Sequence, residues 1–124
     1  MTPQVLVVED NDKNLKLVRD LLQLHGYTTL EAMTATEGVA LAIEHHPDLV
    51  LMDIQLPDMD GREALKRLRA DARTASIPVV AVTAFAMSED REAFLAAGFD
   101  GYLPKPIDVR AFPTQVAGYC AVAT

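Results

Sequence analysis

The sequence predicts one α/β domain, residues 1–124, in which strands and helices alternate as a (βα)5 chain that forms a doubly wound, five-stranded parallel sheet. Several short apolar runs show no alternation of polar and apolar residues, which is typical of strands that are buried on both faces. Segments with helical spacing lie between these runs, and this order implies right-handed crossovers with helices on both sides of the sheet. A chain of 124 residues suits a single domain with one core.

The predicted strands comprise four continuous apolar runs and one weaker segment that contains threonine and glutamate. In chain order they are residues 5–8, 28–32, 49–52, 79–82 and 102–104, of which the second is the weaker one. Each of the four apolar runs leads directly into a polar or charged residue. Because ligands bind outside the carboxyl ends of the strands in an open parallel sheet, we expect these residues to meet in one pocket.

The first three predicted helices are marked by apolar residues that recur on one helical face. The residues are Leu15, Val18 and Leu22 in the first helix, with Leu21 beside them, Val39, Ala42 and Ile43 in the second, and Leu65, Leu68 and Ala72 in the third. Residues 34–37 have the form of a capping box, which predicts the start of the second helix. The longest irregular stretch, residues 54–60, follows Asp53 directly, where a functional loop is expected.

The fourth predicted helix begins at Ser88 and ends near Gly98, with Glu89 and Asp90 in its first turn. The fifth has an apolar face formed by Val109, Phe112, Val116 and Cys120, with Asp108 as a candidate cap. Pro113 falls within this last segment, and proline inside a helix removes a backbone donor and crowds the preceding turn. The sequence therefore leaves a late start, a kink or a short helix open.

The charge and the cysteine content limit the classes of binding partner and the cellular compartments that are expected for this chain. The chain has 18 acidic and 11 basic residues, a net charge of −7, so nucleic acid and anionic membranes are not expected partners. One cysteine fits a reducing compartment. The first residues lack the features of a secretory signal, and no stretch is long and apolar enough to span a bilayer. A cytoplasmic location is expected.

The polar residues at the strand ends have ordinary explanations when each is taken singly, such as helix capping, turn formation or surface charge. Together they suit phosphoryl chemistry. Glu9, Asp10 and Asp53 would repel one another without a counter-charge, which a divalent cation such as Mg²⁺ supplies. Lys105 offers a mobile positive charge for phosphate, and the Thr83 hydroxyl can donate to a phosphoryl oxygen. Asp53 is then free to act as a nucleophile on phosphorus.

These residues lie in segments that resemble the receiver domain of two-component response regulators over nearly the full chain. The segments are residues 7–11, 48–61, 77–87 and 105–107. Within the family, the chain resembles single-domain regulators of the DivK type, and a receiver module derived from a hybrid histidine kinase is an alternative. The resemblance implies a flavodoxin-like fold and a signalling switch that changes conformation on phosphorylation.

The resemblance also implies a role for each site residue. Asp53 accepts the phosphoryl group, and Thr83 and Lys105 contact that group and support catalysis. Mg²⁺ is held by Glu9, Asp10, Asp53 and the backbone carbonyl of Gln55.

Further roles concern the switch and the lifetime of the phosphoryl group. Thr83 and Tyr102 form the implied switch pair, and the peptide bond between Lys105 and Pro106 is implied to be cis. Gln55 and Phe85 lie two residues after Asp53 and Thr83, respectively, where hydrolytic water must approach. Because a bulky apolar ring cannot orient that water, we predict slow loss of phosphate.

The expected partners follow from the same resemblance. A histidine kinase or a histidine phosphotransfer protein donates the phosphoryl group, and a downstream protein reads the change. Because Thr83 ends the fourth strand and Tyr102 lies in the fifth, we expect that change on the face of the fourth helix, fifth strand and fifth helix. A monomer or weak dimer is expected. Since the chain ends after one domain, no output module is expected to follow. The protein would assist its own phosphorylation and dephosphorylation without being an enzyme in the ordinary sense.

Two other classes remain as alternatives. A Mg²⁺-dependent phosphatase with an aspartyl nucleophile, of the haloacid-dehalogenase type, usually has a second acid two residues after the nucleophile, where this chain has Gln55. A flavodoxin-like binding module needs a glycine-rich phosphate loop after the first strand, where residues 9–12 would repel phosphate. Turnover of a generic phosphate ester would favour the phosphatase, and flavin absorbance would favour the binding module.

Overall fold

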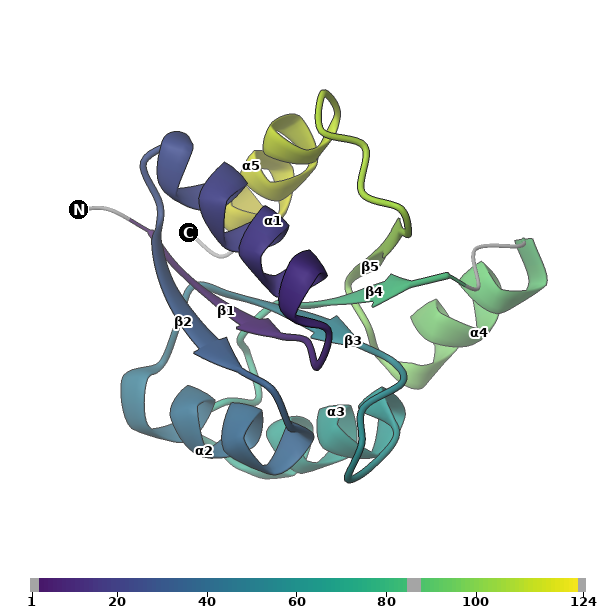
Figure 1. Ribbon diagram of the computed structural model, residues 1–124. Coiled ribbons are helices and arrows are strands. Elements are labelled where there is room, and N and C mark those ends of the chain that lie inside the picture. The colour runs from purple at the N-terminus through teal and green to yellow at the C-terminus, as the bar shows by residue number, and fades with distance from the viewer. Residues whose placement is uncertain (1–2, 85–87, 123–124) are drawn as a thin grey trace.

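One parallel sheet forms the centre of the molecule, as the sequence predicts (Figure 1). The computed structural model describes residues 3–84 and 88–122. The strand order is β2-β1-β3-β4-β5, and every neighbouring pair is parallel. The strands are β1 (Gln4–Val8), β2 (Thr28–Ala32), β3 (Leu49–Asp53), β4 (Val79–Thr83) and β5 (Gly101–Pro104). This is the flavodoxin-like (βα)5 architecture.

Helices cover both faces of this sheet. They are α1 (Asp12–Leu24), α2 (Ala35–His45), α3 (Gly61–Ala70), α4 (Ser88–Ala97) and α5 (Phe112–Val122). Figure 1 shows α1 and α5 on one face, α2 and α3 on the other, and α4 at the end of the molecule near β5. The chain thus alternates between strand and helix, and the carboxyl ends of all the strands lie along the same edge of the sheet.

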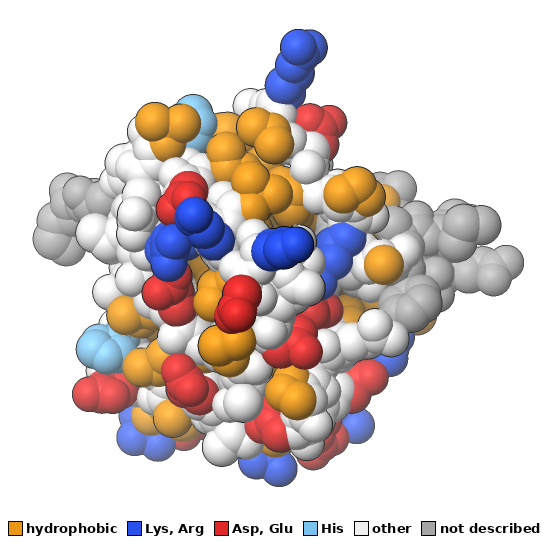
Figure 2. All heavy atoms as spheres, viewed as in Figure 1, with side chains coloured by type: hydrophobic (Ala, Val, Ile, Leu, Met, Phe, Trp, Pro, Cys, Tyr) orange, Lys and Arg blue, Asp and Glu red, His pale blue; other side chains and the backbone are white. Residues whose placement is uncertain are grey.

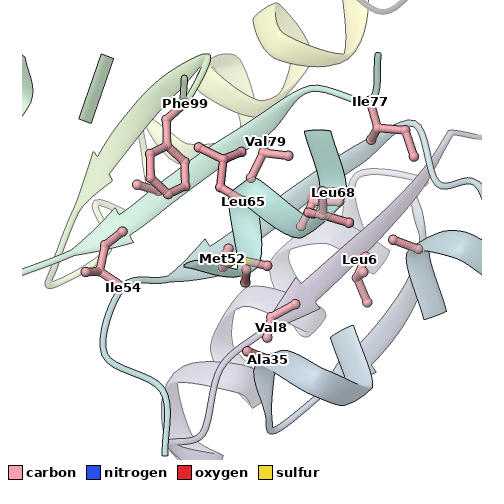
Figure 3. Packing of buried hydrophobic residues seen from close by; sticks show 14 of the residues in the cluster. Leu6, Val8, Ala35, Met52, Ile54, Leu65, Leu68, Ile77, Val79 and Phe99 are labelled. Atoms are coloured by element: carbon pink, nitrogen blue, oxygen red, sulfur yellow. The ribbon is translucent and has the colours of Figure 1, made fainter. Parts of the chain in front are cut away.

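The core is divided between the two faces of the sheet, which explains why the strand sequences are continuously apolar. Successive side chains of a strand point to opposite faces. Leu6 and Val8 therefore pack on the side of α2 and α3 (Figure 3), while Val5 and Val7 pack against α1 and α5. All four are at most 2% exposed. Since each face needs its own apolar set, alternation disappears from the sequence.

Side chains that accept backbone hydrogen bonds define where three helices begin. Asn11 Oδ1 accepts from the amides of Lys13 and Asn14, each at 3.0 Å, at the start of α1. Thr34 Oγ1 accepts from the amide of Glu37 at 3.1 Å, as expected for the predicted capping box. Asp60 caps α3 in the same way. Each cap satisfies amides that have no partner inside the helix.

The predictions for α3 and α5 need correction at particular residues. Helix α3 ends at Ala70, so Ala72 lies outside it and is exposed. Helix α5 begins at Phe112, which leaves Val109 outside the helix and 52% exposed. Of the three outcomes for Pro113, the late start is the observed one. Proline is tolerated there, because amides in the first helical turn have no intrahelical partner to lose.

One arginine at the end of α3 connects two distant loops. The guanidinium of Arg69 donates to the carbonyls of Ala75 at 3.0 Å and Ile77 at 2.6 Å, and to the carboxylate of Asp100 at 2.9 Å. The same Asp100 oxygen accepts from the amide of Val79 at 2.7 Å. These bonds tie the segment that follows α4 to the start of β4, and so anchor the carboxyl-terminal end of α4.

Candidate functional site

Four strands bring the predicted site residues to one edge of the sheet. Asp53 and Thr83 are the last residues of β3 and β4, while Glu9 and Lys105 directly follow β1 and β5. Because β1, β3, β4 and β5 are consecutive in the sheet, these side chains gather at its carboxyl end. Glu9, Asp53 and Thr83 are buried, at 4%, 6% and 1% exposure, whereas Asp10 is exposed. The edge therefore combines buried charge with one side open to solvent.

Three carboxylates at this edge form a group that fits a hard cation. Oxygen atoms of Glu9, Asp10 and Asp53 all lie within 4.8 Å of one another. Mg²⁺ binds oxygen at 2.0–2.1 Å, so opposite ligands of its octahedron lie about 4.2 Å apart. The 4.8 Å limit on the separations of these oxygens is slightly wider than that value, and every donor is a carboxylate oxygen. The residues present therefore fit a magnesium ion in their chemistry and in their closeness to one another.

Lys105 supplies positive charge to two of these carboxylates. Its Nζ lies 2.9 Å from Glu9 Oε2 and 3.1 Å from Asp53 Oδ2. Burial lowers the pKa of Lys105, but its hydrogen bonds to Glu9 and Asp53 outweigh that effect, so the pKa is raised overall. The ammonium group is therefore fully charged at neutral pH. It lies where it can also meet the oxygens of a group bound to Asp53.

Each buried carboxylate uses its second oxygen to fix the neighbouring backbone. Glu9 Oε1 accepts from the amide of Asn11 at 3.2 Å, and Asp53 Oδ1 accepts from the amide of Gln55 at 3.1 Å. Burial raises the pKa of Glu9, and the nearby negative charge of Asp53 acts in the same direction. Lys105 and the Asn11 amide oppose this shift. A second positive charge at this place would favour the ionised form of Glu9 further.

The fourth and fifth strands carry the residues of the implied switch. Thr83 is buried at the end of β4, and its carbonyl accepts from the amide of Lys105 at 2.8 Å. Tyr102 lies in β5 and is half-buried, beside the strand that ends in Thr83. The peptide bond between Lys105 and Pro106 is cis. Phe85, expected to slow hydrolysis, lies outside the described residues, so its predicted role stays a prediction.

Two residues between the end of β3 and the first turn of α3 have structural roles that the sequence alone does not predict. Gly61 begins α3 so close to the end of β3 that an added Cβ would lie 2.7 Å from the Asp53 carbonyl oxygen. A side chain cannot be accommodated there without moving the backbone that carries the site. Asp58 connects the loop to α2 through three hydrogen bonds. Gly61 lies within the receiver-like segment 48–61, so its position could have been noticed in the sequence. No sequence pattern indicates that Asp58 binds the start of α2.

Comparison with known proteins gives consistent results. The family described as "Response regulator receiver domain" matches residues 5–117. The polar-differentiation response regulator DivK of Brucella ovis is 48% identical over 119 residues, which are 96% of this chain and 97% of that protein. The DivK protein of Brucella anthropi is 46% identical over the same shares of both chains.

Solved structures have the same fold. A CheY-like response regulator receiver domain from Methanospirillum hungatei superposes with a TM-score of 0.87 at 30% identity, covering 99% of this chain and 97% of the other. The receiver domain of the sensor histidine kinase PA1611 from Pseudomonas aeruginosa has a TM-score of 0.88 at 30% identity, covering 98% and 99%. In that structure a magnesium ion is coordinated in the active-site cleft.

Within residues 3–84 and 88–122, no helix is both long enough and apolar enough to span a membrane.

Proposed function

Since the chain belongs to the response regulator receiver domain family and is a phosphorylation-dependent signalling switch, we propose that Asp53 is its phosphoacceptor. The observation that carries this proposal is the placement of the Asp53 carboxylate beside both the acidic group and the Lys105 ammonium. One oxygen meets Lys105 and the other is held by the Gln55 amide, so the carboxylate is oriented from two sides.

The proposed ligands of Mg²⁺ are Glu9, Asp10, Asp53 and the backbone carbonyl of Gln55. The three carboxylates that lie within 4.8 Å of one another support this assignment, as does the magnesium ion in the PA1611 receiver domain. When bound, Mg²⁺ would offset the charge of the carboxylates and of the phosphoryl oxygens. Removing the metal is therefore expected to stop phosphorylation without preventing folding, because Lys105 already pairs with two of the three acids.

The proposed reaction transfers one phosphoryl group. An oxygen of the Asp53 carboxylate attacks phosphorus, a P–O bond forms, and the P–N bond to the donor histidine breaks with its electron pair remaining on the imidazole. Lys105 and the Thr83 hydroxyl meet the charge on the phosphoryl oxygens. In this way the domain would assist its own phosphorylation. Hydrolysis of the acyl phosphate by water would return Asp53 to its free form, at a rate that we propose Gln55 and Phe85 tune.

The proposed partners are proteins. A histidine kinase or phosphotransfer protein would supply the phosphoryl group, and a downstream protein would read the altered surface near Thr83 and Tyr102. We place this exchange in the cytoplasm, with residues 1–124 acting as one receiver domain in a monomer or weak dimer. The phosphatase alternative is not favoured, since Gln55 occupies the place of its second acid. The family match disfavours the flavin-binding alternative as well.

The decisive experiment labels the protein with a phosphorylated histidine kinase or with acetyl phosphate, and maps the label. Labelling is expected on Asp53, to require Mg²⁺, and to disappear in Asp53→Asn. Asp20→Asn is a suitable control, because Asp20 is an exposed aspartate of α1. Labelling that persists unchanged in Asp53→Asn, or that needs no divalent cation, would contradict the proposal.

A further inference from the structure

The loop of residues 54–60 carries the backbone carbonyl that we assign to Mg²⁺, and its base is fixed by short contacts. The amide of Gly61 donates to the carbonyl of Ile54 at 2.8 Å, and Gln55 forms an isolated antiparallel bridge with Asp60. These contacts close the base of the loop next to Asp53. The tip, residues 56–59, extends beyond them and needs a separate attachment.

Asp58 provides that attachment by holding the first turn of α2. One carboxylate oxygen accepts from the amide of Ala35 at 2.8 Å. The other accepts from the amide of Thr36 at 2.8 Å and from its hydroxyl at 2.5 Å. We call these three bonds the Asp58 clamp. The hydroxyl and the amides of α2 together lower the pKa of Asp58 to about 2, so the carboxylate is charged at neutral pH.

The first turn of α2, which the clamp binds, is closely packed against the core. Ala35 is fully buried and lies beside Val8 in the core (Figure 3). One turn later, Gly38 approaches Val8 so closely that an added Cβ would lie 2.7 Å from its side chain. The start of α2 is thus packed against β1, the strand that leads into Glu9. The clamp therefore joins the loop after β3 to the strand that precedes the first acid of the site.

We propose that Asp58 is a positioning residue for the cation site, which holds the loop so that the Gln55 carbonyl and the Asp53 carboxylate keep their orientation. The proposal rests on the assignment of Gln55 and Asp53 to Mg²⁺. Residues that orient metal ligands without touching the metal commonly change metal affinity by about 10- to 100-fold. Coupling of this kind is reciprocal, so occupation of the site also stabilises the bonds between Asp58 and α2.

The test measures Mg²⁺ affinity by calorimetry or NMR titration in graded variants. Asp58→Ala removes the whole clamp and is expected to weaken Mg²⁺ binding about tenfold. Thr36→Val removes one of the three bonds and is expected to have a smaller effect in the same direction. Asp108→Ala is the matched control, because Asp108 also accepts from two successive amides, those of Arg110 and Ala111, at 3.0 and 3.2 Å. Its Mg²⁺ affinity is expected to equal that of the unmodified protein.

A second measurement follows the reciprocal effect in the unmodified protein. Exchange of the Ala35 and Thr36 amide protons is expected to slow when Mg²⁺ and beryllofluoride are added, relative to the amides of Arg110 and Ala111. This measurement needs no variant, so it remains decisive if Asp58→Ala does not fold. A folded Asp58→Ala that binds Mg²⁺ within twofold of the unmodified protein would overturn the proposal, as would unchanged exchange at Ala35 and Thr36. If the unmodified protein binds no Mg²⁺, the proposed function fails instead.

Discussion

Lys105 lies between two buried carboxylates, so its charge serves both the free and the phosphorylated states of the site. In the free state Nζ pairs with Glu9 and Asp53. A phosphoryl group on Asp53 would offer the same ammonium a new partner. Lys105 thus opposes the binding of a divalent cation to the carboxylates, whereas it favours the transfer of the phosphoryl group.

Replacing Lys105 by methionine is expected to separate the two effects. The lost unit charge lies 2.9 and 3.1 Å from carboxylate oxygens of Glu9 and Asp53. Since a charge pair at about 4 Å is worth on the order of 1–4 kcal/mol, its removal should tighten Mg²⁺ binding about tenfold or more. Phosphorylation by acetyl phosphate should slow at the same time, since the phosphoryl oxygens lose their counter-charge. Calorimetry and labelling rates measure the two quantities. Lys66→Met, which changes an exposed lysine of α3, should alter neither. Weaker Mg²⁺ binding in Lys105→Met would contradict this account.

Asp58 is expected to titrate at unusually low pH. Its pKa is about 2 in the folded protein, against an ordinary value of 3.8, because the Thr36 hydroxyl and the amides of Thr36 and Ala35 bind the charged form. A lowered pKa stabilises the fold above the ordinary value, and this contribution is lost as pH falls through about 2. An NMR titration of the carboxyl carbon should give that midpoint. In Thr36→Val the midpoint should rise toward 3.8, and an unchanged midpoint would disprove the assigned cause.

Residues at strand ends could be predicted because two local signals agree on them. Glu9, Asp53, Thr83 and Lys105 each follow a continuous apolar run, and parallel strands end together. Asp58 has no such signal, because the sequence around an exposed loop acid does not show whether the start of a helix lies next to it in the fold. Its partners are 22 and 23 positions away, a pairing that only the folded sheet defines.

Two glycines, one in α5 and one in β5, differ in whether they can accept a side chain. Gly118 lies within α5, and an added Cβ there would meet no atom within 4 Å. Gly101 begins β5, and an added Cβ would collide with the ring and hydroxyl of Tyr119 from α5. The two glycines thus differ in their structural role. Gly118 lies where a side chain would fit, whereas Gly101 is needed for the close approach of α5 to β5.

These two glycines give a matched pair of expected outcomes. Gly118→Ala should stabilise the protein by about 1 kcal/mol, because alanine is the better helix former. Gly101→Ala should destabilise it by about 1–3 kcal/mol through overcrowding against Tyr119. Urea unfolding measures both. Combining Gly101→Ala with Tyr119→Leu should cost less than the sum of the two single changes, and strict additivity would argue against the collision.

The strands were easier to predict than the helix ends. Residues 28–32 were predicted with the bounds that β2 has, and the other strands differ by one residue at an end. By contrast, Val109 and Ala72 fit a helical period yet lie outside helices. Apolar spacing continues past the point where backbone hydrogen bonding stops, so periodicity alone does not locate a terminus. Pro113 indicates where α5 begins, because proline is favoured in the first turn of a helix.

The described contacts of α4 anchor its carboxyl-terminal half. Phe94, in the second half of α4, is fully buried against Phe99 and lies under the guanidinium of Arg62, 5.1 Å from the ring centre. Beyond the helix, Asp100 is held by Arg69. A rearrangement of α4 that keeps these contacts would pivot about its carboxyl-terminal end.

Phosphorylation is accordingly expected to alter residues 88–93 more than residues 94–100. Comparison of amide exchange or NMR shifts with and without beryllofluoride and Mg²⁺ tests this. A switch of this kind biases an existing equilibrium, so a few kcal/mol of differential stabilisation is enough. Changes confined to the Asp53 loop, with residues 88–104 silent, would mean that the signal leaves by another surface. Equal changes along all of α4 would contradict the pivot.

Charge over the surface bears on the kind of partner that the molecule can meet. Figure 2 shows acidic and basic side chains interspersed, with apolar side chains between them, on the face in view. The excess of acidic residues gives a net charge of −7. Such a surface disfavours polyanions and suits proteins whose docking faces combine apolar and charged groups.

The two outer strands of the sheet have a consequence for self-association. β2 and β5 are the edges, and an edge strand is a template on which a second chain can add a strand and begin to aggregate. β5 has only four residues and ends in the exposed Pro104, which has no amide to donate. β2 carries exposed Glu31, paired with Arg19 of α1 at 3.0 Å. Both edges are thus poor templates for cross-β growth.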